Sequence, residues 1–303
     1  LLNMHHIVAD GWSLGVLVRD LGELYAAALE GRASSLAVPT LHYADYAAWQ
    51  RGWLDESRLQ GQLGYWREQL ADAPVLLELP TDRPRPAVKT YRGAQLSVML
   101  EASLVERLEA LSRSQGATLF MTLLAAFKVL LFRYSGQGDV LVGSPIANRT
   151  HRQTEELVGF FVNTLVLRSR LEREQPFTEL LGALRETTLD AYAHQDLPFE
   201  TLVEDLAPQR SLSHSPLFQA MFGLQNAPFE TVELAGVRAE PLTLDTDTAK
   251  FDLLVNLSQV DGAISGVWEF STDLFDVSRM ERMLGHYEAL LRAIIEVPEE
   301  AIG

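Results

Sequence analysis

The densest group of residues that can do chemistry lies at the front of the chain, in His5-His6-Ile7-Val8-Ala9-Asp10-Gly11-Trp12-Ser13. An imidazole has an ordinary pKa of about 6.5, so His6 can take a proton from an attacking amine or alcohol near neutral pH. A carboxylate four residues later, at Asp10, can hold the loop or a neighbouring cation. Gly11 has no Cβ, so a substrate or a backbone amide can approach it closely. The spacing alone also fits paired histidines that only hold a helix start in place.

Two other chemistries are less well supported by the same residues. His5, His6 and Asp10 are of the types that bind zinc or iron, but the sequence has no His-Glu-x-x-His motif, no nearby third histidine and no cysteine to complete a coordination shell. We therefore predict no metal site. Ser13 lacks the Gly-x-Ser-x-Gly elbow of a nucleophilic serine and is better placed to cap the helix that follows.

Composition and charge exclude several classes of protein. The 303 residues carry 25 Lys plus Arg against 41 Asp plus Glu, a formal charge of −16, whereas proteins that bind nucleic acid concentrate positive charge. The absence of cysteine excludes disulfides and suits a reducing compartment. No secretory signal pattern opens the chain, so we expect a cytoplasmic protein. The most apolar stretch, residues 119–132, contains Lys128 and is shorter than the about 20 residues that a bilayer requires, so we predict a buried core helix and no membrane association.

The elements that position these residues follow from hydrophobic periodicity. Apolar residues from Leu14 to Leu29 recur at helical spacing and predict a helix that starts near Ser13 and stops at Gly31. Further helices are predicted around 43–54 and 59–70, from a capping box at Ser103–Glu106, from Thr118, over 177–193, after Pro198 and over 277–295. Strands are predicted at 95–100, 140–146, 160–167, 218–224, 233–244, 251–258 and 263–271, the last two joined by a tight hairpin at Asp261-Gly262.

A proline-rich joint divides this pattern. Pro80, Pro84 and Pro86 lie between residues 79 and 93, where prolines remove hydrogen-bond donors and keep the preceding residues out of helices. We therefore predict two domains, 1–85 and 86–303. Strands and helices are mixed along the chain, so the predicted fold class is α/β with two layers in each lobe.

The front cluster resembles the His-His-x-x-x-Asp-Gly signature of the condensation domains of nonribosomal peptide synthetases. Later segments are similar to further motifs of that family, and they occur in the family's order. These segments are Tyr43–Gln50, Val158–Thr164, His194–Glu200 and Arg210–Gln219. Several acyltransferase families share the first motif, but five ordered matches along one chain are specific to the condensation domains.

The resemblance implies a fold and a reaction. The expected fold has two chloramphenicol-acetyltransferase-like lobes of mixed sheet plus helices, with the first lobe incomplete. Carrier-bound donor and acceptor would enter a tunnel from opposite ends, and the acceptor amine would attack the donor acyl or peptidyl thioester to form an amide. The expected partners are donor and acceptor peptidyl carrier proteins and neighbouring synthetase domains. No cofactor is expected to bind directly, because phosphopantetheine arrives on the carriers.

The resemblance also assigns roles to residues of the front cluster. By position, His6 is the catalytic histidine, and the backbone amide of Gly11 is a candidate for stabilising the oxyanion. His5 and Asp10 are expected to be mainly structural. The expected substrate-binding residues are Trp12, Ser13 and Asn163. His194 and His214, in the later motifs, are expected to be structural.

The chain departs from the family at its front. Family members carry an arginine-bearing motif ahead of the signature, and nothing before Leu1 matches it, so we expect the chain to be the larger, C-terminal part of a condensation domain. That arginine is the expected partner of the motif aspartate. Asp10 is therefore expected either to be unpaired or to use another cation, because an unpartnered buried carboxylate is costly.

Carrier docking should use local basic patches, and the sequence offers two sets: Arg83, Arg85 and Lys89, or Arg149 and Arg152. Three alternatives to peptide-bond formation remain open. The chain can be a non-catalytic lobe assembly that binds carriers, a relative that epimerises an aminoacyl thioester, or an ester-forming enzyme, since an alcohol and an amine place similar demands on His6.

Overall fold

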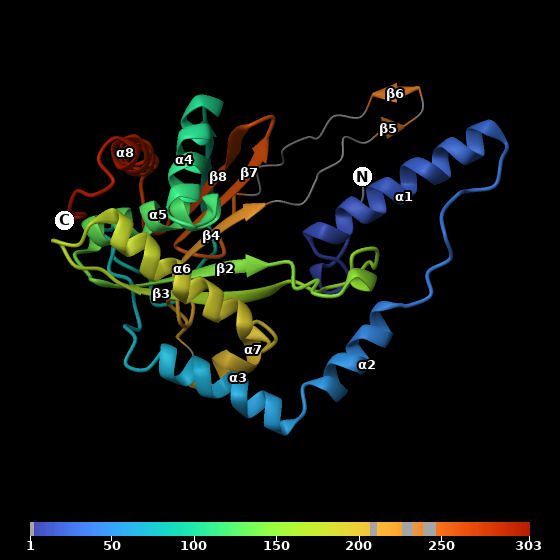
Figure 1. Ribbon diagram of the computed structural model, residues 1–303, viewed down its shortest axis with the longest axis horizontal. Coiled ribbons are helices and arrows are strands. Elements are labelled where there is room, and N and C mark those ends of the chain that lie inside the picture. The colour runs from blue at the N-terminus through green and yellow to red at the C-terminus, as the bar shows by residue number, and fades with distance from the viewer. Residues whose placement is uncertain (1–2, 207–210, 226–232, 235, 239–246) are drawn as a thin grey trace. The chain divides into compact units, whose positions relative to one another are not determined.

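The computed structural model describes residues 3–206, 211–225, 233–234, 236–238 and 247–303 (Figure 1). The chain forms two compact units. The first comprises Leu1–Gly61, Ile146–Asn163 and Asn226–Leu244, and the second comprises Gln62–Pro145, Thr164–Gln225 and Asp245–Gly303. The units therefore do not follow a single boundary at residue 85. The proline-rich joint belongs to the second unit, where the Asp82 N–H donates to the Leu274 carbonyl at 2.8 Å and Arg85 pairs with Asp252.

The first unit contains the front cluster and the helices that follow it. A 3₁₀ turn, η1 (His6–Val8), leads into α1 (Gly11–Glu30), and α2 (Tyr43–Trp53) and the turn η2 (Arg152–Thr154) complete its described helical parts. Helix α1 ends at Gly31, whose φ of 63° confirms the predicted stop. The predicted cap at Ser13 is wrong: Asp10 is the N-cap, and its carboxylate accepts from the Ser13 N–H.

The second unit is built on a six-stranded sheet with strand order β1-β8-β7-β4-β2-β3 (Figure 1). β8 runs antiparallel to both β1 and β7, and β4 runs parallel to both β7 and β2. The strands are β1 (Gly93–Leu100), β2 (Asp139–Ile146), β3 (Asn163–Arg170), β4 (Ala220–Gln225), β7 (Leu253–Val260) and β8 (Ala263–Ser271). Mixed strand directions and packed helices confirm the predicted α/β class.

Helices cover this sheet, and α5 (Leu119–Ser135) is the central one. It contacts α4 (Ala102–Ser114), α6 (Phe177–Ala193) and α8 (Val277–Glu296). Every residue from Met121 to Phe132 is buried, which confirms the predicted core helix. The remaining helices are α3 (Glu56–Gln69) and α7 (Phe199–Leu206). Among the described helices, none alone is long and apolar enough to cross a bilayer, and α4 with α5 meets that length and composition only across a 100° bend.

One charged side chain lies inside this core. Lys128 is fully buried, and its ammonium donates to the carbonyl of Leu167 at 2.6 Å, to the hydroxyl of Ser169 at 2.9 Å and to the carbonyl of Val140 at 3.4 Å. Burial lowers the pKa of Lys128 to about 7, although Asp139 favours the charged form. The ammonium therefore joins α5 to β2 and β3 through hydrogen bonds.

Two local predictions for the second unit have opposite outcomes. The Asp261-Gly262 hairpin is confirmed: both residues have positive φ, 51° and 79°, and Val260 pairs with Ala263 across the turn. The capping box at Ser103 is wrong, because the N-cap of α4 is Glu101, two residues earlier, and it makes no side-chain cap bond.

Two predicted strands have different outcomes: one begins later than predicted, and the other lies only partly within the described residues. The strand predicted at 160–167 begins at Asn163, because the two phenylalanines before it belong to a loop of the first unit. Of the strand predicted at 233–244, the described parts are β5 (Glu233–Leu234) and β6 (Val237–Arg238), which pair as an antiparallel ribbon. The rest of that strand, and Arg210, lie outside the described residues.

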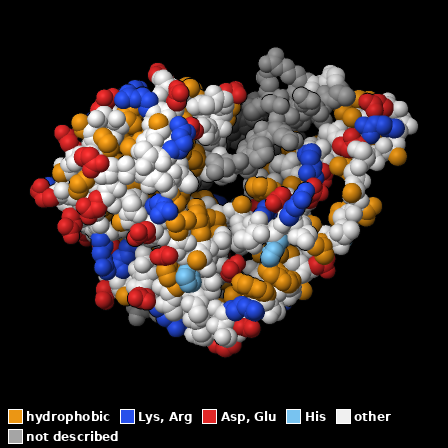
Figure 2. Space-filling view, viewed as in Figure 1, with side chains coloured by type: hydrophobic (Ala, Val, Ile, Leu, Met, Phe, Trp, Pro, Cys, Tyr) orange, Lys and Arg blue, Asp and Glu red, His pale blue; other side chains and the backbone are white. Residues whose placement is uncertain are grey.

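Acidic and basic side chains are interspersed over the face of the molecule drawn in Figure 2. On that face, the residues drawn in colour form no extended basic surface. This distribution agrees with the formal charge of −16.

Candidate active site

The turn η1 presents the two histidines differently. His5 caps the turn, because its Nδ1 accepts from the Ile7 N–H at 3.1 Å. The His6 side chain is exposed, and its ring meets the ring of Phe160 edge-on, with the centroids 5.2 Å apart and the planes at 88°. The backbone bond from the Ala9 N–H to the His6 carbonyl closes the turn. The second imidazole is therefore held on a short, hydrogen-bonded turn as an exposed side chain.

Asp10 fastens this turn to a distant segment of the same unit. Its carboxylate is only 3% exposed. Oδ1 accepts from the Ser13 N–H at 2.8 Å, and Oδ2 accepts from the Phe161 N–H at 2.9 Å. The Asp10 N–H donates to the Gly159 carbonyl at 3.1 Å. A single side chain therefore caps α1 and binds the turn to residues 159–161.

Arg149 supplies the cation for Asp10. Its side chain is 1% exposed, and Nη2 lies 3.1 Å from Asp10 Oδ1. Nη1 donates to the carbonyls of Leu157, at 2.8 Å, and Thr154. The guanidinium also lies over the ring of Phe161, 4.1 Å from its centroid. Of the two expectations for Asp10, the structure confirms the second: the aspartate uses another cation.

Ser13 completes the buried network. It is 0% exposed, and its Oγ lies 2.7 Å from Asp10 Oδ1 and 2.9 Å from the Gly159 carbonyl, either of which can take its one proton. The same oxygen accepts from the Gly159 N–H at 3.0 Å and from Arg149 Nη2 at 2.9 Å. All of these contacts are internal, so Ser13 ties the network together, and its expected role as a substrate contact stays a prediction.

The electrostatics of the network keep its ion pair charged. Burial raises the pKa of Asp10, but hydrogen bonds from Ser13 and Phe161, together with Arg149, lower it further than burial raises it, to below its usual range. Burial lowers the pKa of Arg149 and Asp10 opposes this, while a guanidinium stays protonated in proteins under all ordinary conditions. The Tyr43 hydroxyl donates to the Phe160 carbonyl at 2.7 Å, and burial followed by the Asp10 charge raises its pKa.

The remaining predicted residues of the front cluster flank the network. The indole N–H of Trp12 donates to the Glu155 carbonyl at 2.8 Å. Gly11 is exposed and begins α1, and a Cβ built on it would meet no atom within 4 Å. Backbone N–H groups and the helix dipole favour negative charge at the first turn of this 20-residue helix, and the oxyanion role of Gly11 stays a prediction.

Asn163 lies apart from the network in the sequence. It is the first residue of β3 and is 8% exposed. Its proposed role as a substrate contact stays a prediction. In the part of the chain that the structure describes, no three His, Asp or Glu side chains come together as a group that could hold a metal ion.

Neither composition nor periodicity singles out three residues of the site, Tyr43, Gly159 and Phe160. Gly159 is required sterically, because a Cβ there would lie 2.2 Å from the ring of Tyr43. Tyr43, Gly159 and Phe160 do lie in two segments that the family resemblance selected, and the rings of Tyr46 and Phe161 from these segments meet with centroids 4.6 Å apart. The resemblance could therefore have pointed to them, whereas residue type alone could not.

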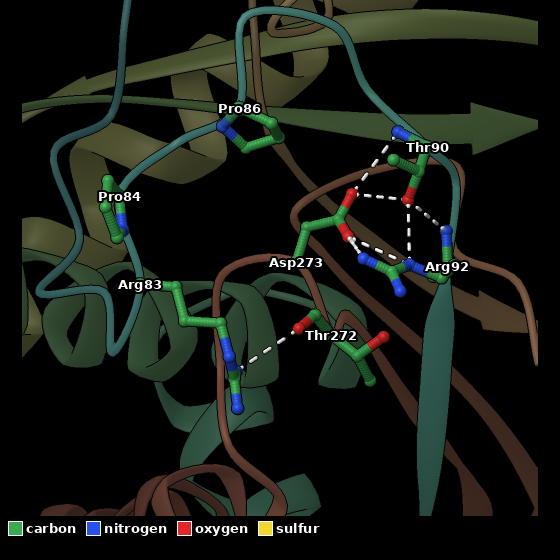
Figure 3. A pocket seen from close by; sticks show the side chains of 7 residues that line it. All are labelled: Arg83, Pro84, Pro86, Thr90, Arg92, Thr272 and Asp273. Atoms are coloured by element: carbon green, nitrogen blue, oxygen red, sulfur yellow. Dashed lines mark hydrogen bonds and ion pairs between the residues drawn. The ribbon is translucent and has the colours of Figure 1, made fainter.

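The structure revises the two expected docking patches. Arg149 is buried, so the patch of Arg149 and Arg152 is wrong. In the other patch, Arg83 donates to the Thr272 carbonyl at 3.2 Å (Figure 3). Arg83 also pairs with Asp276. Arg85 holds both carboxylate oxygens of Asp252, at 3.1 and 2.5 Å. These two guanidiniums are therefore already neutralised within the second unit.

The two later histidines have structural contacts. His194 stacks on Tyr65, with the centroids 4.0 Å apart, and its carbonyl accepts from the indole of Trp66 at 3.0 Å. His214 Nδ1 lies 3.2 Å from the Ser215 carbonyl. These contacts support the structural roles expected from the sequence.

Comparison with known proteins gives the family. The family model described as the condensation domain matches residues 1–303. A linear gramicidin synthase polypeptide of Brevibacillus parabrevis is 51% identical over 304 residues, which cover 100% of this chain and 4% of that protein. Malpinin synthetase of Mortierella alpina is 46% identical over 303 residues, again covering 100% of this chain and 4% of the relative. The chain thus spans a small fraction of these relatives.

Solved structures agree with these relatives. The X-domain from teicoplanin biosynthesis has a TM-score of 0.89 and 30% identity, covering 99% of this chain and 69% of that one. A four-domain nonribosomal peptide synthetase bound to AMP and glycine has a TM-score of 0.88 and 26% identity, covering 99% and 24% respectively. A family model that matches every residue, and synthetase relatives that align over the whole chain, show that this protein belongs to the condensation-domain family of nonribosomal peptide synthetases.

Proposed function

We propose that the polypeptide that carries this chain joins a donor acyl or peptidyl thioester to an acceptor amine, with His6 handling the amine proton. The observation that carries the proposal is the exposed His6 imidazole, held on a turn that the buried Asp10–Arg149 ion pair fixes in place. Relatives named as peptide synthetases support the same reaction class. The donor and acceptor would arrive on carrier proteins.

The proposed step balances as follows. The acceptor nitrogen attacks the thioester carbonyl carbon, so that a C–N bond forms and a C–S bond breaks. His6 accepts the proton that the nitrogen loses and returns it to the departing sulfur. The products are an amide and the free thiol of the donor carrier's phosphopantetheine. Because the thioester is already activated, this chemistry needs no diffusible cofactor.

Two features lower the barrier in this proposal. General acid–base help from a positioned imidazole contributes about 10²–10⁴-fold. The Gly11 N–H, at the first turn of α1, would donate to the oxyanion of the tetrahedral intermediate, where the helix dipole adds to its effect. In this proposal four residues only position the turn, because their contacts hold it and none of these contacts is to the His6 ring. They are His5, Asp10, Ser13 and Arg149.

The substrate contacts of the proposal are Trp12 and Asn163. Trp12 is half-buried beside the turn and Asn163 begins the strand that follows the Phe160–Phe161 loop. Docking of the carriers is proposed for exposed side chains that are not yet neutralised, which removes Arg149, Arg83 and Arg85 from the two basic sets.

The test uses the polypeptide that carries this chain, with donor and acceptor loaded on carrier proteins. His6→Ala should lower the rate of dipeptidyl-thioester formation at least about 100-fold, measured by mass spectrometry of the acceptor carrier. His286→Ala is the control, because His286 is an exposed histidine of α8 whose ring nitrogen lies 2.8 Å from the Tyr134 hydroxyl. Unchanged turnover in His6→Ala would remove His6 from the mechanism.

The same assay separates the alternatives. Carrier binding without product in the unmodified polypeptide would favour a binding assembly. An acceptor that carries a hydroxyl in place of the amine tests ester formation, since an ester product formed faster than the amide would overturn the amide assignment. Deuterium uptake at the donor α-carbon without amide formation would favour epimerisation.

A further inference from the structure

A cavity of about 680 Å³ lies wholly within the second unit, and none of its lining residues belongs to the candidate active site. Three short segments form its walls, residues 88–91, 211–218 and 248–251, which lead into β1, β4 and β7. β1 and β7 are both antiparallel to β8, and β4 is parallel to β7, so all three strands run in one direction. The cavity therefore sits where three parallel strands begin, on one edge of the sheet.

The charge around this cavity is unusual for the chain. The sequence has three lysines against 22 arginines. Lys128 is buried in the core, and the other two, Lys89 and Lys250, both line the cavity. Among the described lining residues, none is acidic. The cavity lining therefore carries two cations and no carboxylate in a protein that is strongly negative overall, and the acidic side chain that interacts electrostatically with Lys250, Glu269, lies outside the lining.

Neutral groups hold the Lys89 ammonium. It donates to the Ser215 hydroxyl at 3.2 Å and to the Lys250 carbonyl. Asp252 attracts it electrostatically, but the carboxylate of Asp252 is bound on both oxygens by Arg85. The Lys89 side chain is half-buried, and this burial lowers its pKa. A half-buried ammonium without a carboxylate in contact is a position that an anion would stabilise.

Aromatic side chains form the floor and one wall. Phe218 is 2% exposed, and its ring stacks on that of Phe251 with the centroids 5.4 Å apart. Phe218 also fills the space over Gly143, where a Cβ would lie 2.3 Å from the ring. Lys89 lies over the ring of Tyr91 at 5.1 Å. The cavity thus combines an apolar body with a cationic rim, and its volume lies within the range of about 300–1,000 Å³ that is usual for small-molecule sites.

The backbone around the cavity is strained. Tyr91 lines the cavity with a φ of 62°. Leu217, with a φ of 64°, lies between two lining residues, and Asp247, with a φ of 48°, directly precedes a third. Positive φ is disfavoured for the bulky side chains of Tyr91 and Leu217, and such residues gather where the surrounding structure needs a particular geometry.

A neighbouring pocket shows the contrast. It is lined by Arg83, Arg92, Thr272, Asp273 and three further residues (Figure 3). There Asp273 accepts from Arg92 at 2.8 Å and from the Thr90 hydroxyl at 2.6 Å, so its cations already have partners. That pocket has no unneutralised charge to offer a ligand, whereas the lysine-lined cavity does.

We propose that the lysine-lined cavity binds a small carboxylic acid with an aromatic or aliphatic body. The carboxylate lies between Lys89 and Lys250, and the body packs on Phe218, Phe251 and Tyr91. A carboxylate suits the rim better than a phosphate, because the lining holds no arginine fork and part of the Lys89 donor capacity is already used.

The first test is calorimetric titration of the full chain with 3-phenylpropanoate. Lys89→Met should weaken binding at least about tenfold, because it removes a charge-assisted hydrogen bond. Arg92→Met is the matched control, since it removes a cation from the neighbouring pocket, and it should leave the affinity within about twofold. The neutral 3-phenylpropanamide should bind much more weakly than the acid.

A second measurement does not depend on variants. Trace acetylation of the unmodified chain by acetic anhydride, read by mass spectrometry, should label Lys89 and Lys250 and spare the buried Lys128. Saturating 3-phenylpropanoate should slow acetylation of Lys89 and Lys250 severalfold, and the amide should not. The proposal is overturned if no binding is detected at millimolar acid, if acid and amide bind equally, or if phenyl phosphate binds more tightly than the carboxylate.

Discussion

Replacing Arg149 by Met removes the cation of the buried network while keeping an apolar stem of similar length. The loss is specific. Asp10 loses the guanidinium at 3.1 Å, the carbonyls of Leu157 and Thr154 lose their shared donor, and Ser13 Oγ loses the donor at 2.9 Å. Asp10 retains the donors Ser13 N–H and Phe161 N–H, so its carboxylate is not left wholly without partners. The Met side chain can still pack on Phe161, which limits the damage to electrostatics and hydrogen bonding.

The expected magnitude follows from these contacts. Breaking a buried ion pair by removing one partner usually costs about 3–5 kcal/mol. The two retained donors to Asp10 place this case near the lower end, at about 3 kcal/mol of unfolding free energy. In the double variant Asp10→Asn with Arg149→Met no unpaired carboxylate remains, so the two changes should cost about 1–2 kcal/mol less than their sum. Arg149→Lys should restore little, because an ammonium cannot reproduce the fork of donors.

The assay is urea unfolding of the full chain, followed by tryptophan fluorescence. Trp12 reports on the network directly, since the Arg149 guanidinium lies 5.7 Å from its ring centroid. Arg107→Met is the matched control: Arg107 pairs with Glu296 at 2.7 Å on the surface, and exposed pairs contribute about 0–1 kcal/mol. The reasoning fails if Arg149→Met is no more destabilising than Arg107→Met, or if the Asp10 and Arg149 changes simply add.

Three further predictions test other contacts. Because the folded pKa of Lys128 is about 7, below the ordinary 10.5, the unfolded chain holds more protons between these values, so stability should rise with pH across that window. Relative to Lys128→Met, the unmodified chain should gain about 3 kcal/mol in urea unfolding between pH 7 and pH 10, and a parallel pH profile in the variant would contradict the assignment. Gly159→Ala forces a Cβ to 2.2 Å from the Tyr43 ring and should lower the free energy of unfolding by about 1–3 kcal/mol. Adding Tyr43→Ala to the same chain should restore part of this loss. If the two losses simply add, the two residues do not touch. Trp12→Phe removes the N–H that donates to the Glu155 carbonyl and should cost about 1 kcal/mol in the same unfolding assay, and no loss would mean that water replaces the bond.

Much of the fold could be predicted from periodicity, because those elements are fixed by local rules. Helix α6 spans Phe177–Ala193, which are its predicted bounds, and the Asp261-Gly262 hairpin needs only two residues that tolerate positive φ. Boundaries failed where tertiary contacts take precedence. Phe160 and Phe161 look like strand residues by their apolarity, yet the loop they form serves the first unit through contacts to the rings of His6 and Tyr43.

The candidate site was only partly accessible from the sequence. His6, Asp10 and Gly11 lie within a span of six residues, so spacing alone could nominate them. Arg149 lies 139 positions from Asp10, and nothing in its neighbourhood distinguishes it from a surface arginine. Its role depends on a long-range packing arrangement that brings residues 146–163 against the front of the chain within the first unit. The compact units differ from a division at residue 85 for a related reason, because proline marks a stiff segment and does not show which unit that segment joins.

The placement of Phe218 constrains how the lysine-lined cavity can diversify among descendants of this sequence. The ring is wedged over Gly143, a strand residue with no side chain of its own, so any change of its size disturbs the sheet. Substitution of Phe218 is therefore a costly way to change which ligand the cavity binds. The rim is open to change, since Leu212 and Val88 are 69% and 57% exposed and support no core packing. Ligand preference should thus change through substitutions at Leu212 and Val88, while Phe218 is retained.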